Sequence, residues 1–429
     1  MSPETTLTRR RLIGLAAASA AAIPLGGLWR PGPAAAGDPI ADAYQRAFAA
    51  MIGDNKDVRW YQDARREILY RPRQVLVADA DARRVIARLR KMGLPVTGGG
   101  EFAGVTVLLF DREVDVPAVV DVLRDPDQWP GERVPGVQPH HVLLGFGKIM
   151  GNPDGPPTAT GQLPARDPAR GTEGAGVTVG ICDTGIWRDA AAAHPDWLGG
   201  SYVPEADDED SLYTYGDVLA LEGGHGTFVA GVVRQAAPGV RFDPERALEA
   251  SGLGDEASLV AALGRLGSTV SVINLSLGGY TLGDVPPLPL VNALAALPAG
   301  VVTVAAAGNA GSTRPTWPAA LGPVVAVAAT ATGETGPQPA SYSNYGPWVD
   351  AWAPGTWTST FVKGRRSLPG VPDEEFGGVA GWSGTSFAAA YVSGRLAAQM
   401  TAGGLSADEA RLRLLAGQPA PFGDGVLVE

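Results

Sequence analysis

The chain has 429 residues, of which 45% are hydrophobic and 18% are charged, and it carries a formal net charge of −11. This composition allows a large buried core and excludes wholesale disorder. The single cysteine excludes an intramolecular disulfide framework and any metal site built from several cysteines. Residues 151–429 carry a net charge of −14. So acidic a main body argues against nucleic acid as a partner, because phosphate binding needs a basic surface.

The N-terminal residues have the pattern of an export signal. Arginines at positions 9–11 precede an apolar run over residues 12–29, and an A-x-A pattern ends at Ala36. This pattern predicts a secretory signal over residues 1–36, and the adjacent arginines favour the twin-arginine pathway. The alternative, an uncleaved membrane anchor, is disfavoured by Pro24 inside the run. No later stretch reaches the ~18 apolar residues of a spanning helix, so we expect an extracellular or cell-envelope protein.

Residues 37–150 are predicted to form a small α+β domain. Their patterns, in chain order, are helical spacing over 38–70 with a break at Gly53, a strand over 73–79, a helix over 82–93, a strand over 104–110 and a helix over 116–125. Residues 151–175 are rich in glycine and proline and lack apolar periodicity, which predicts a linker or processing region.

Residues 176–429 alternate between short valine-rich runs and helical patterns. The runs that predict strands are 176–182, 270–276, 301–306 and 324–329, and the segments that predict helices are 226–235, 255–266 and 289–297. Such alternation predicts an α/β domain with a central parallel sheet and helices on both faces. Functional residues of such sheets lie at the carboxyl ends of the strands.

Three polar residues stand where that rule expects chemistry. Asp183 ends the first strand in VGICDTGIW, His225 opens a helix after two glycines, and Ser386 opens an apolar helix in GWSGTSFAAAYVSG. Taken singly, each has a structural interpretation, as a turn-forming aspartate, a structural histidine and a helix N-cap serine. Taken together, they supply a nucleophile, a base and a group that orients the base.

The order of these residues discriminates between classes of serine hydrolase. An α/β-hydrolase runs Ser–Asp–His with a G-x-S-x-G elbow, whereas here no histidine follows Ser386. A chymotrypsin-like enzyme would be all-β. The segments DTG at Asp183, HGT at His225 and GTS at Ser386, together with AAAGNAG over 305–311, resemble the subtilisin-like serine proteases, or subtilases. Subtilisin is a standard example of a triad in this order.

The resemblance, which covers residues 175–415, implies a role for each motif residue. Ser386 would attack the scissile carbonyl, His225 would take and return the proton, and Asp183 would orient His225. The side chain of Asn309 and the backbone N–H of Ser386 would form the oxyanion hole.

The resemblance also implies the domain plan. Residues 176–429 would form a three-layer α/β/α catalytic domain. Residues 37–150 would be a propeptide, which assists folding and blocks the cleft until it is cut between about His141 and Gly176.

A substrate-binding strand and an apolar specificity pocket are implied as well. The residues assigned to substrate binding are Ser276, Leu277, Gly278, Ala306, Ala307 and Gly308. The first three would pair with the peptide backbone as an added strand. The small apolar walls predict a medium to large apolar side chain before the cut.

Some positions depart from the family pattern. The replaced residues, all expected to pack in the core, are Phe228, Phe387, Ala390 and Tyr391. Segment 236–254 lacks the clean strand pattern of the family, which puts one strand in doubt. Cys182 precedes the aspartate in a strand that should be buried, and we interpret it as a small core residue.

The acidic segment EADDED (205–210) is interpreted as a solvated acidic loop, because no EF-hand-like ligand spacing is present. The alternatives are that it binds structural calcium, which is common in the family, or attracts basic substrates. No metal or cofactor is expected to take part in catalysis. The expected partners are protein or peptide substrates and the chain's own propeptide, and we expect a monomer.

The main prediction is therefore a secreted serine endopeptidase. One alternative is a catalytically silent subtilase fold used for binding, which would lack a catalytic group, although all four are present here. Another is a narrow-specificity envelope processing protease resembling the mycosins. Those typically end in a membrane helix, whereas this sequence ends in PFGDGVLVE.

Overall fold

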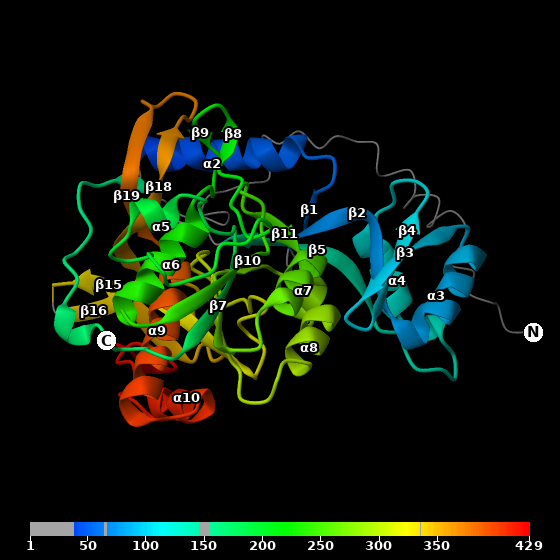
Figure 1. The fold of residues 1–429 in the computed structure, drawn as a ribbon. Coiled ribbons are helices and arrows are strands. Elements are labelled where there is room, and N and C mark those ends of the chain that lie inside the picture. The colour runs from blue at the N-terminus through cyan, green and yellow to red at the C-terminus, as the bar shows by residue number, and fades with distance from the viewer. Residues whose placement is uncertain (1–37, 64–66, 146–154, 335) are drawn as a thin grey trace, which may run out of the picture. The chain divides into compact units, whose positions relative to one another are not determined.

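The structure is a computed structural model that describes residues 38–63, 67–145, 155–334 and 336–429 (Figure 1). The predicted signal at residues 1–36 lies outside these ranges. None of the helices in the described ranges is long and apolar enough to cross a membrane.

The chain divides into two compact units. Among the described residues, the smaller unit contains Ile52–Val142 and Thr281–Ala295, and the larger contains the described part of Pro31–Met51 together with Leu143–Tyr280 and Ala296–Glu429. This division differs from the predicted boundary at residue 150 in two places. Residues before Ile52 group with the C-terminal body, and a later segment groups with the smaller unit.

The smaller unit is an antiparallel sheet with helices packed on it. Its elements are β1 (Arg59–Gln62), β2 (Glu67–Ala78), α3 (Asp79–Lys91), β3 (Val96–Phe102), β4 (Val105–Phe110), α4 (Val116–Arg124), most of β5 (Val137–Gly145) and α8 (Leu288–Ala295). β2 pairs with β4 and β5, and β4 also pairs with β3. The helical spacing expected over 38–70 holds only to Asp54, because the aromatic and aliphatic residues of RWYQ and EILY suit strands and form β1 and the start of β2.

The larger unit contains the predicted parallel sheet, with strand order β10-β7-β12-β14-β15-β17-β20. Its strands are β7 (Thr178–Asp183), β10 (Arg241–Arg246), β12 (Val270–Leu275), β14 (Val302–Ala306), β15 (Val324–Gly333), β17 (Ala351–Pro354) and β20 (Val426–Leu427), and β16 (Gly336–Pro339) adds antiparallel to β15. The strand that the sequence left in doubt is β10. β10 lies at the edge of the sheet and has a neighbouring strand on one side only. An edge strand tolerates a proline such as Pro244, which has no backbone N–H to donate.

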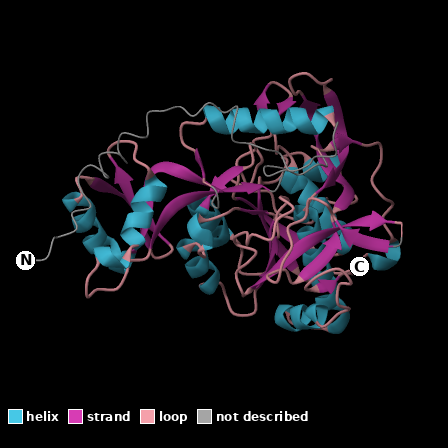
Figure 2. Ribbon diagram, turned by 180° about the vertical axis from the view of Figure 1, so that it is seen from behind, coloured by secondary structure: helices cyan, strands magenta, loops and turns pink. Residues whose placement is uncertain are grey.

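Helices cover both faces of this sheet. Val179 and Ile181 of β7 belong to the core that α6 (His225–Ala236) and α9 (Thr385–Gly403) form. A Cβ at Gly180 would instead meet Leu266, at the end of α7 (Glu256–Arg265). Because successive side chains of a strand point to opposite faces, α6 and α9 cover one face and α7 the other. The predicted three-layer α/β/α fold is thus confirmed, and Figure 2 shows the same elements from behind.

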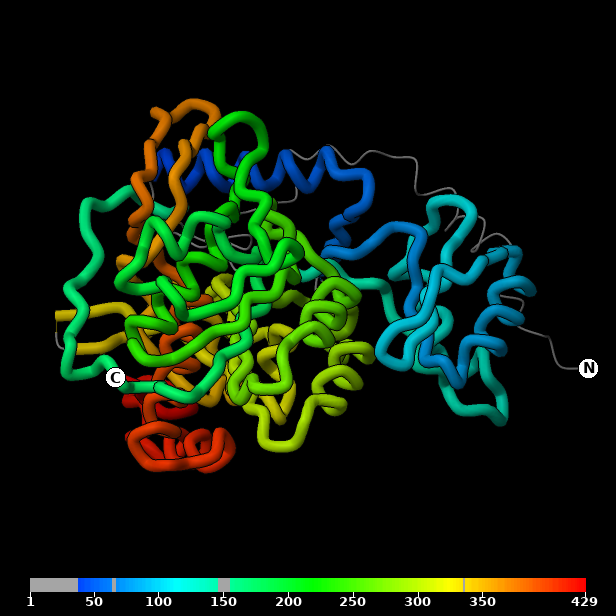
Figure 3. Tube along the Cα trace, viewed as in Figure 1, coloured from blue at the N-terminus to red at the C-terminus, as the bar shows by residue number. Residues whose placement is uncertain are grey.

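The two helices that carry His225 and Ser386 pack directly on each other. A Cβ at Gly394 of α9 would lie 2.5 Å from the Cβ of Ala236 on α6, so only glycine allows this approach. In Figure 3 the orange-red trace of α9 lies next to the green trace of α6, and α10 (Ala407–Leu415) packs on α9. This close contact fixes the end of α6 against the middle of α9.

A second, antiparallel sheet flanks the larger unit. It consists of β6 (Thr158–Ala159), β8 (Tyr213–Tyr215), β9 (Val218–Leu219), β18 (Thr356–Arg366) and β19 (Glu374–Ser383). β6 belongs to the predicted linker, and Arg366 donates a hydrogen bond to the carbonyl of Pro157. Part of that linker is therefore fixed on the larger unit.

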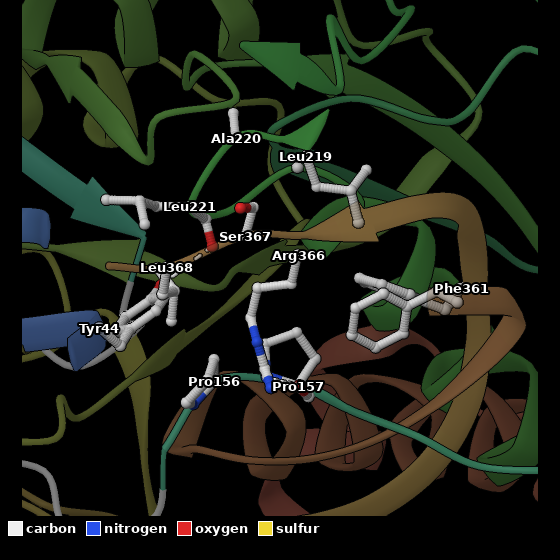
Figure 4. Close-up of a pocket in the computed structure, with 12 residues that line it drawn as sticks. Tyr44, Pro156, Pro157, Leu219, Ala220, Leu221, Phe361, Arg366, Ser367 and Leu368 are labelled. Carbon is white, nitrogen blue, oxygen red and sulfur yellow. Dashed lines mark hydrogen bonds between the residues drawn. The ribbon is translucent and has the colours of Figure 1, made fainter. Parts of the chain in front are cut away.

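The first described helix, α2 (Pro39–Asp54), packs on the same unit through its residues before Ile52. Ala43 and Tyr44 are buried against Leu368, which follows β18. Figure 4 shows Tyr44 near Leu221 and Leu368 at one side of a pocket, with Pro156, Pro157 and Arg366 among its other walls. The apolar side chains of this helix thus find their partners far along the chain.

Candidate active site

Asp183 and His225 form a buried pair at the carboxyl end of β7. Asp183 is the last residue of that strand, and His225 is the first residue of α6 after Gly224, whose φ is 92°. Nδ1 of His225 lies 2.7 Å from Oδ1 of Asp183, and both side chains are 1% exposed. Nδ1 therefore carries the proton in this pair, and Nε2 is the nitrogen that can accept one.

Opposing effects set the pKa of His225. Burial lowers it, but the charge of Asp183 and the hydrogen bond to Asp183 outweigh burial, so that the pKa lies above its ordinary value of 6.5. Glu222, three residues before the histidine, adds to this rise. The neutral imidazole that can act as a base is therefore favoured only at higher pH than for an ordinary histidine.

A buried carboxylate that the sequence did not single out supports this pair. Asp210 accepts hydrogen bonds from the Thr184 hydroxyl at 2.7 Å and from the Gly224 N–H at 2.8 Å. The Thr184 hydroxyl in turn accepts from the Gly226 N–H at 3.1 Å. Burial raises the pKa of Asp210 to about 6. These bonds connect the loop after Asp183 to the start of α6. In the sequence, Asp210 was marked only as one of the acidic residues of segment 205–210.

Ser386 stands in the first turn of α9 and is 1% exposed. Its hydroxyl donates to the carbonyl oxygen of Ser276 at 3.4 Å, a long hydrogen bond. Among the described residues, that is the bond its hydroxyl makes, rather than one to His225. Formation of a serine–histidine bond therefore requires this hydroxyl to change its partner, and such bonds often tighten only when substrate is bound.

Asn309 is held by the loop that carries the serine. Its Oδ1 accepts from the N–H and from the hydroxyl of Thr385, both at 2.9 Å. The Thr385 hydroxyl also accepts from the N–H of Gly308 at 3.0 Å. Because Oδ1 is fixed on Thr385, Nδ2 is the donor edge of the amide, as an oxyanion hole requires.

The loop around Asn309 has a second support that the sequence did not reveal. The side chain of Asn344 accepts from the N–H groups of Ala310 and Ser312 at 3.0 Å and donates to the carbonyl of Ala307 at 2.9 Å. Asn344 is 1% exposed. It lies in YSNYG, a turn-like sequence that gives no local sign of this role.

The predicted substrate-binding strand is paired with residues of this same chain. β13 (Leu277–Gly278) pairs antiparallel with Leu144 and Gly145, the end of β5. The N–H of Gly145 donates to the carbonyl of Gly252, just before β11 (Leu253–Asp255), at 2.9 Å. Residues 143–145 therefore lie as an added strand, in the manner expected of a bound peptide.

The other predicted substrate residues are buried. The hydroxyl of Ser276 donates to the carbonyl oxygen of Ser386 at 2.9 Å, so this side chain holds the first turn of α9. Ala306 and Ala307 are fully buried in two different core clusters, and Gly308 has a φ of 101°. Their contribution to a specificity pocket stays a prediction.

The positions that depart from the family pattern pack in the core, as expected. Phe228 and Phe387 are 0% and 1% exposed, and their ring centroids lie 4.5 Å apart, so an aromatic residue on α6 matches one on α9. The rings of Trp382 and Phe387 lie 5.2 and 5.4 Å from the imidazole of His225. Ala390 is fully buried, Tyr391 is partly buried beside Trp357, and Cys182 is buried as a free thiol.

The acidic segment 205–210 is not uniformly solvated. Asp208 is 2% exposed, and burial raises its pKa to about 7. Ligand oxygens of Glu205, Asp207 and Asp208 lie within 4.8 Å of one another. The group has the donor type that calcium prefers, and calcium binding there stays a prediction.

Fold, residue order and site geometry define a subtilisin-like serine endopeptidase, a hydrolase of peptide bonds. The model of the subtilase family matches residues 174–415, and the chain belongs to this family. Thermitase of Thermoactinomyces vulgaris is 34% identical over 253 residues, which are 56% of this chain and 80% of thermitase. Subtilisin Savinase of Lederbergia lenta is 33% identical over 243 residues, 53% of this chain and 77% of that protein.

A solved structure supports the same fold. The crystal structure of fervidolysin from Fervidobacterium pennivorans, described as a keratinolytic enzyme related to subtilisin, superposes with a TM-score of 0.58 at 19% identity. The match covers 84% of this chain and 60% of fervidolysin. At this identity the likeness concerns the fold alone.

Proposed function

We propose that this protein is an exported serine endopeptidase whose triad is Asp183, His225 and Ser386. The observation that carries the proposal is the buried 2.7 Å contact between Nδ1 of His225 and Oδ1 of Asp183, beside α9, whose first turn contains the serine. It fixes the tautomer in which Nε2 can accept the hydroxyl proton of Ser386. An intact pair of this kind also favours an enzyme over a silent binding protein.

The mechanism follows from these groups. Oγ of Ser386 attacks the scissile carbonyl while Nε2 of His225 takes its proton. Nδ2 of Asn309 and the N–H of Ser386 donate to the oxyanion of the tetrahedral intermediate. The histidinium, stabilised by Asp183, returns the proton to the leaving amine, and water then hydrolyses the acyl-enzyme by the same route. Every role is filled by the chain itself, so no metal or cofactor enters this mechanism.

We also propose that the residues before the cut act as a propeptide that occupies the cleft. Leu144 pairs with Gly278 and Gly145 pairs with Leu277, so the chain runs toward Ser276 as it continues. The carbonyl of Ser276 accepts a hydrogen bond from the hydroxyl of Ser386. The cut is therefore expected shortly after Gly145, inside the range of 141–176 expected from the sequence. The proposal includes export through the twin-arginine-type signal at residues 1–36 and action as a monomer outside the cytoplasm.

One variant tests catalysis and self-processing together. In subtilisin, a relative, loss of the serine costs about 10⁶-fold in kcat, and we expect a loss of the same order for Ser386→Ala with casein as substrate. The variant should also remain full-length and resist labelling by a fluorophosphonate, whereas Ser393→Ala on the same helix should process and label normally. Labelling of the Ser386→Ala protein at wild-type level would overturn the assignment.

A further inference from the structure

A buried carboxylate lies next to the strand 143–145 and has no part in the mechanism. Glu222, in the loop before α6, is 2% exposed. Its Oε1 accepts a hydrogen bond from the hydroxyl of Tyr44 on α2. Within the described part of the chain, its Oε2 is buried without a hydrogen-bond partner. Because an unpaired buried oxygen is costly, Oε2 is well suited to accept a hydrogen bond from a group that enters beside it.

The side chain of Glu222 borders the position of Gly145. A Cβ placed on Gly145 would lie 3.9 Å from Cγ of Glu222 and 3.2 Å from a terminal methyl of Leu248. A Cβ on Gly252 would lie 2.5 Å from Cγ of Glu222, so glycine there leaves the space that this glutamate fills. A substrate side chain at the position of Gly145 would therefore extend between Leu248 and Glu222, with a shift of a few tenths of an ångström at the Leu248 methyl.

The charges around Glu222 favour a cation. Burial raises the pKa of Glu222 to about 7, the charges of Asp183 and Asp210 act in the same direction, and His225 acts in the opposite one. The charges of Asp183 and Asp210 thus disfavour a negative charge on Glu222. A lysine or arginine at the adjacent substrate position would offset this effect and would keep Glu222 ionised.

We propose that Glu222 is a specificity-determining residue that selects lysine or arginine at the substrate position occupied by Gly145 in the precursor. The proposal rests on the proposed peptidase function. Leu248 would contact the methylene groups of the side chain, and Glu222 would accept from its charged end. The precursor has glycine at this position, so its own segment has no side chain that could contact Glu222. A cationic substrate can therefore displace that segment more easily than a neutral one.

The test uses the full chain, expressed and left to process itself, with active sites counted by fluorophosphonate labelling. Its substrates are quenched fluorescent peptides that copy residues 141–150 and differ only at position 145, which is Gly, Lys or the uncharged norleucine. For the wild-type enzyme we expect kcat/KM for the lysine peptide to exceed that for the norleucine peptide at least about tenfold, as one charge-assisted hydrogen bond allows. Equal rates for the two peptides, or a requirement for glycine, would overturn the proposal without touching the peptidase assignment.

Two variants assign the preference to this carboxylate. In Glu222→Gln the lysine-to-norleucine ratio should fall to about one, since the charge is lost and the shape is kept. In Glu249→Gln, which removes an exposed charge from the neighbouring loop, the ratio should match that of the wild type. A ratio that survives in Glu222→Gln would show that another group selects the cation. Failure of the wild type to cleave any of the peptides would instead count against the proposed function.

Discussion

The residues around His225 are stabilised by two different parts of the chain. On the catalytic side, Asp183 and Asn309 are held by residues of the larger unit that follow the predicted processing region, among them Thr184 and Thr385. On the side of Glu222, the neighbours are Tyr44 and Gly145, which precede that region. These bonds to Asp183 and Asn309 thus come from residues after that region, whereas the neighbouring subsite is covered by the part that we propose is removed.

Among the variants that test this contrast, Asp183→Asn is expected to change kcat the most. Asp183→Asn should lower kcat about 10⁴-fold, because the amide favours the wrong tautomer of the histidine, as in the trypsin example of the same change. The measurement is peptide hydrolysis, with circular dichroism to confirm folding. Asp189→Asn, which removes an exposed carboxylate nearby, is the matched control and should be fully active. Less than a tenfold loss in Asp183→Asn would mean that His225 is oriented by other groups.

The oxyanion donor should have the next largest effect. Asn309→Ala should reduce kcat by about 10²–10³ and leave KM nearly unchanged, because the amide donates to charge that develops only in the transition state. Steady-state kinetics on one peptide separates the two constants. An effect confined to KM would assign Asn309 to substrate binding and not to the oxyanion hole.

The pH dependence of kcat/KM tests how strongly Asp183 raises the pKa of His225. His225 must be neutral to accept a proton, so kcat/KM should fall about tenfold per pH unit below its pKa. That pKa lies above 6.5, chiefly because Asp183 opposes the effect of burial. The acidic limb should therefore have its midpoint above 6.5, and this midpoint should move down in Asp183→Asn. A wild-type midpoint at or below 6.5 would contradict the raised pKa.

The smallest expected effect concerns the cover over Glu222. Tyr44→Phe removes the hydroxyl that donates to this carboxylate and leaves Oε1 buried without it, at a cost of about 1–3 kcal/mol in the free energy of unfolding. Urea unfolding of the precursor, kept intact by Ser386→Ala, measures the change. Tyr345→Phe, at a 47% exposed tyrosine, should leave stability unchanged. Equal stability of the two variants would show that the Tyr44 hydroxyl contributes nothing.

Much of the fold could be predicted because the signals were local. Valine-rich runs and helical spacing predicted β7, β12, β14 and β15 and the helices α6 and α7. The long antiparallel strands β18 and β19 were not predicted, because their sequences, rich in Gly, Thr and charged residues, become strands by pairing with each other. The division of the chain was missed at α2, since nothing in its own sequence says that Ala43 and Tyr44 pack against a residue more than 300 positions later.

The sequence by itself determined the class of this protein. The short motifs that contain Asp183, His225, Asn309 and Ser386 are local, and their order identifies the family. Only the tertiary structure decided what surrounds them. Asp210 and Asn344 act through bonds to loops distant in sequence. The role that we propose for Glu222 depends on two glycines and a tyrosine brought to it by folding, so no local pattern could have marked it.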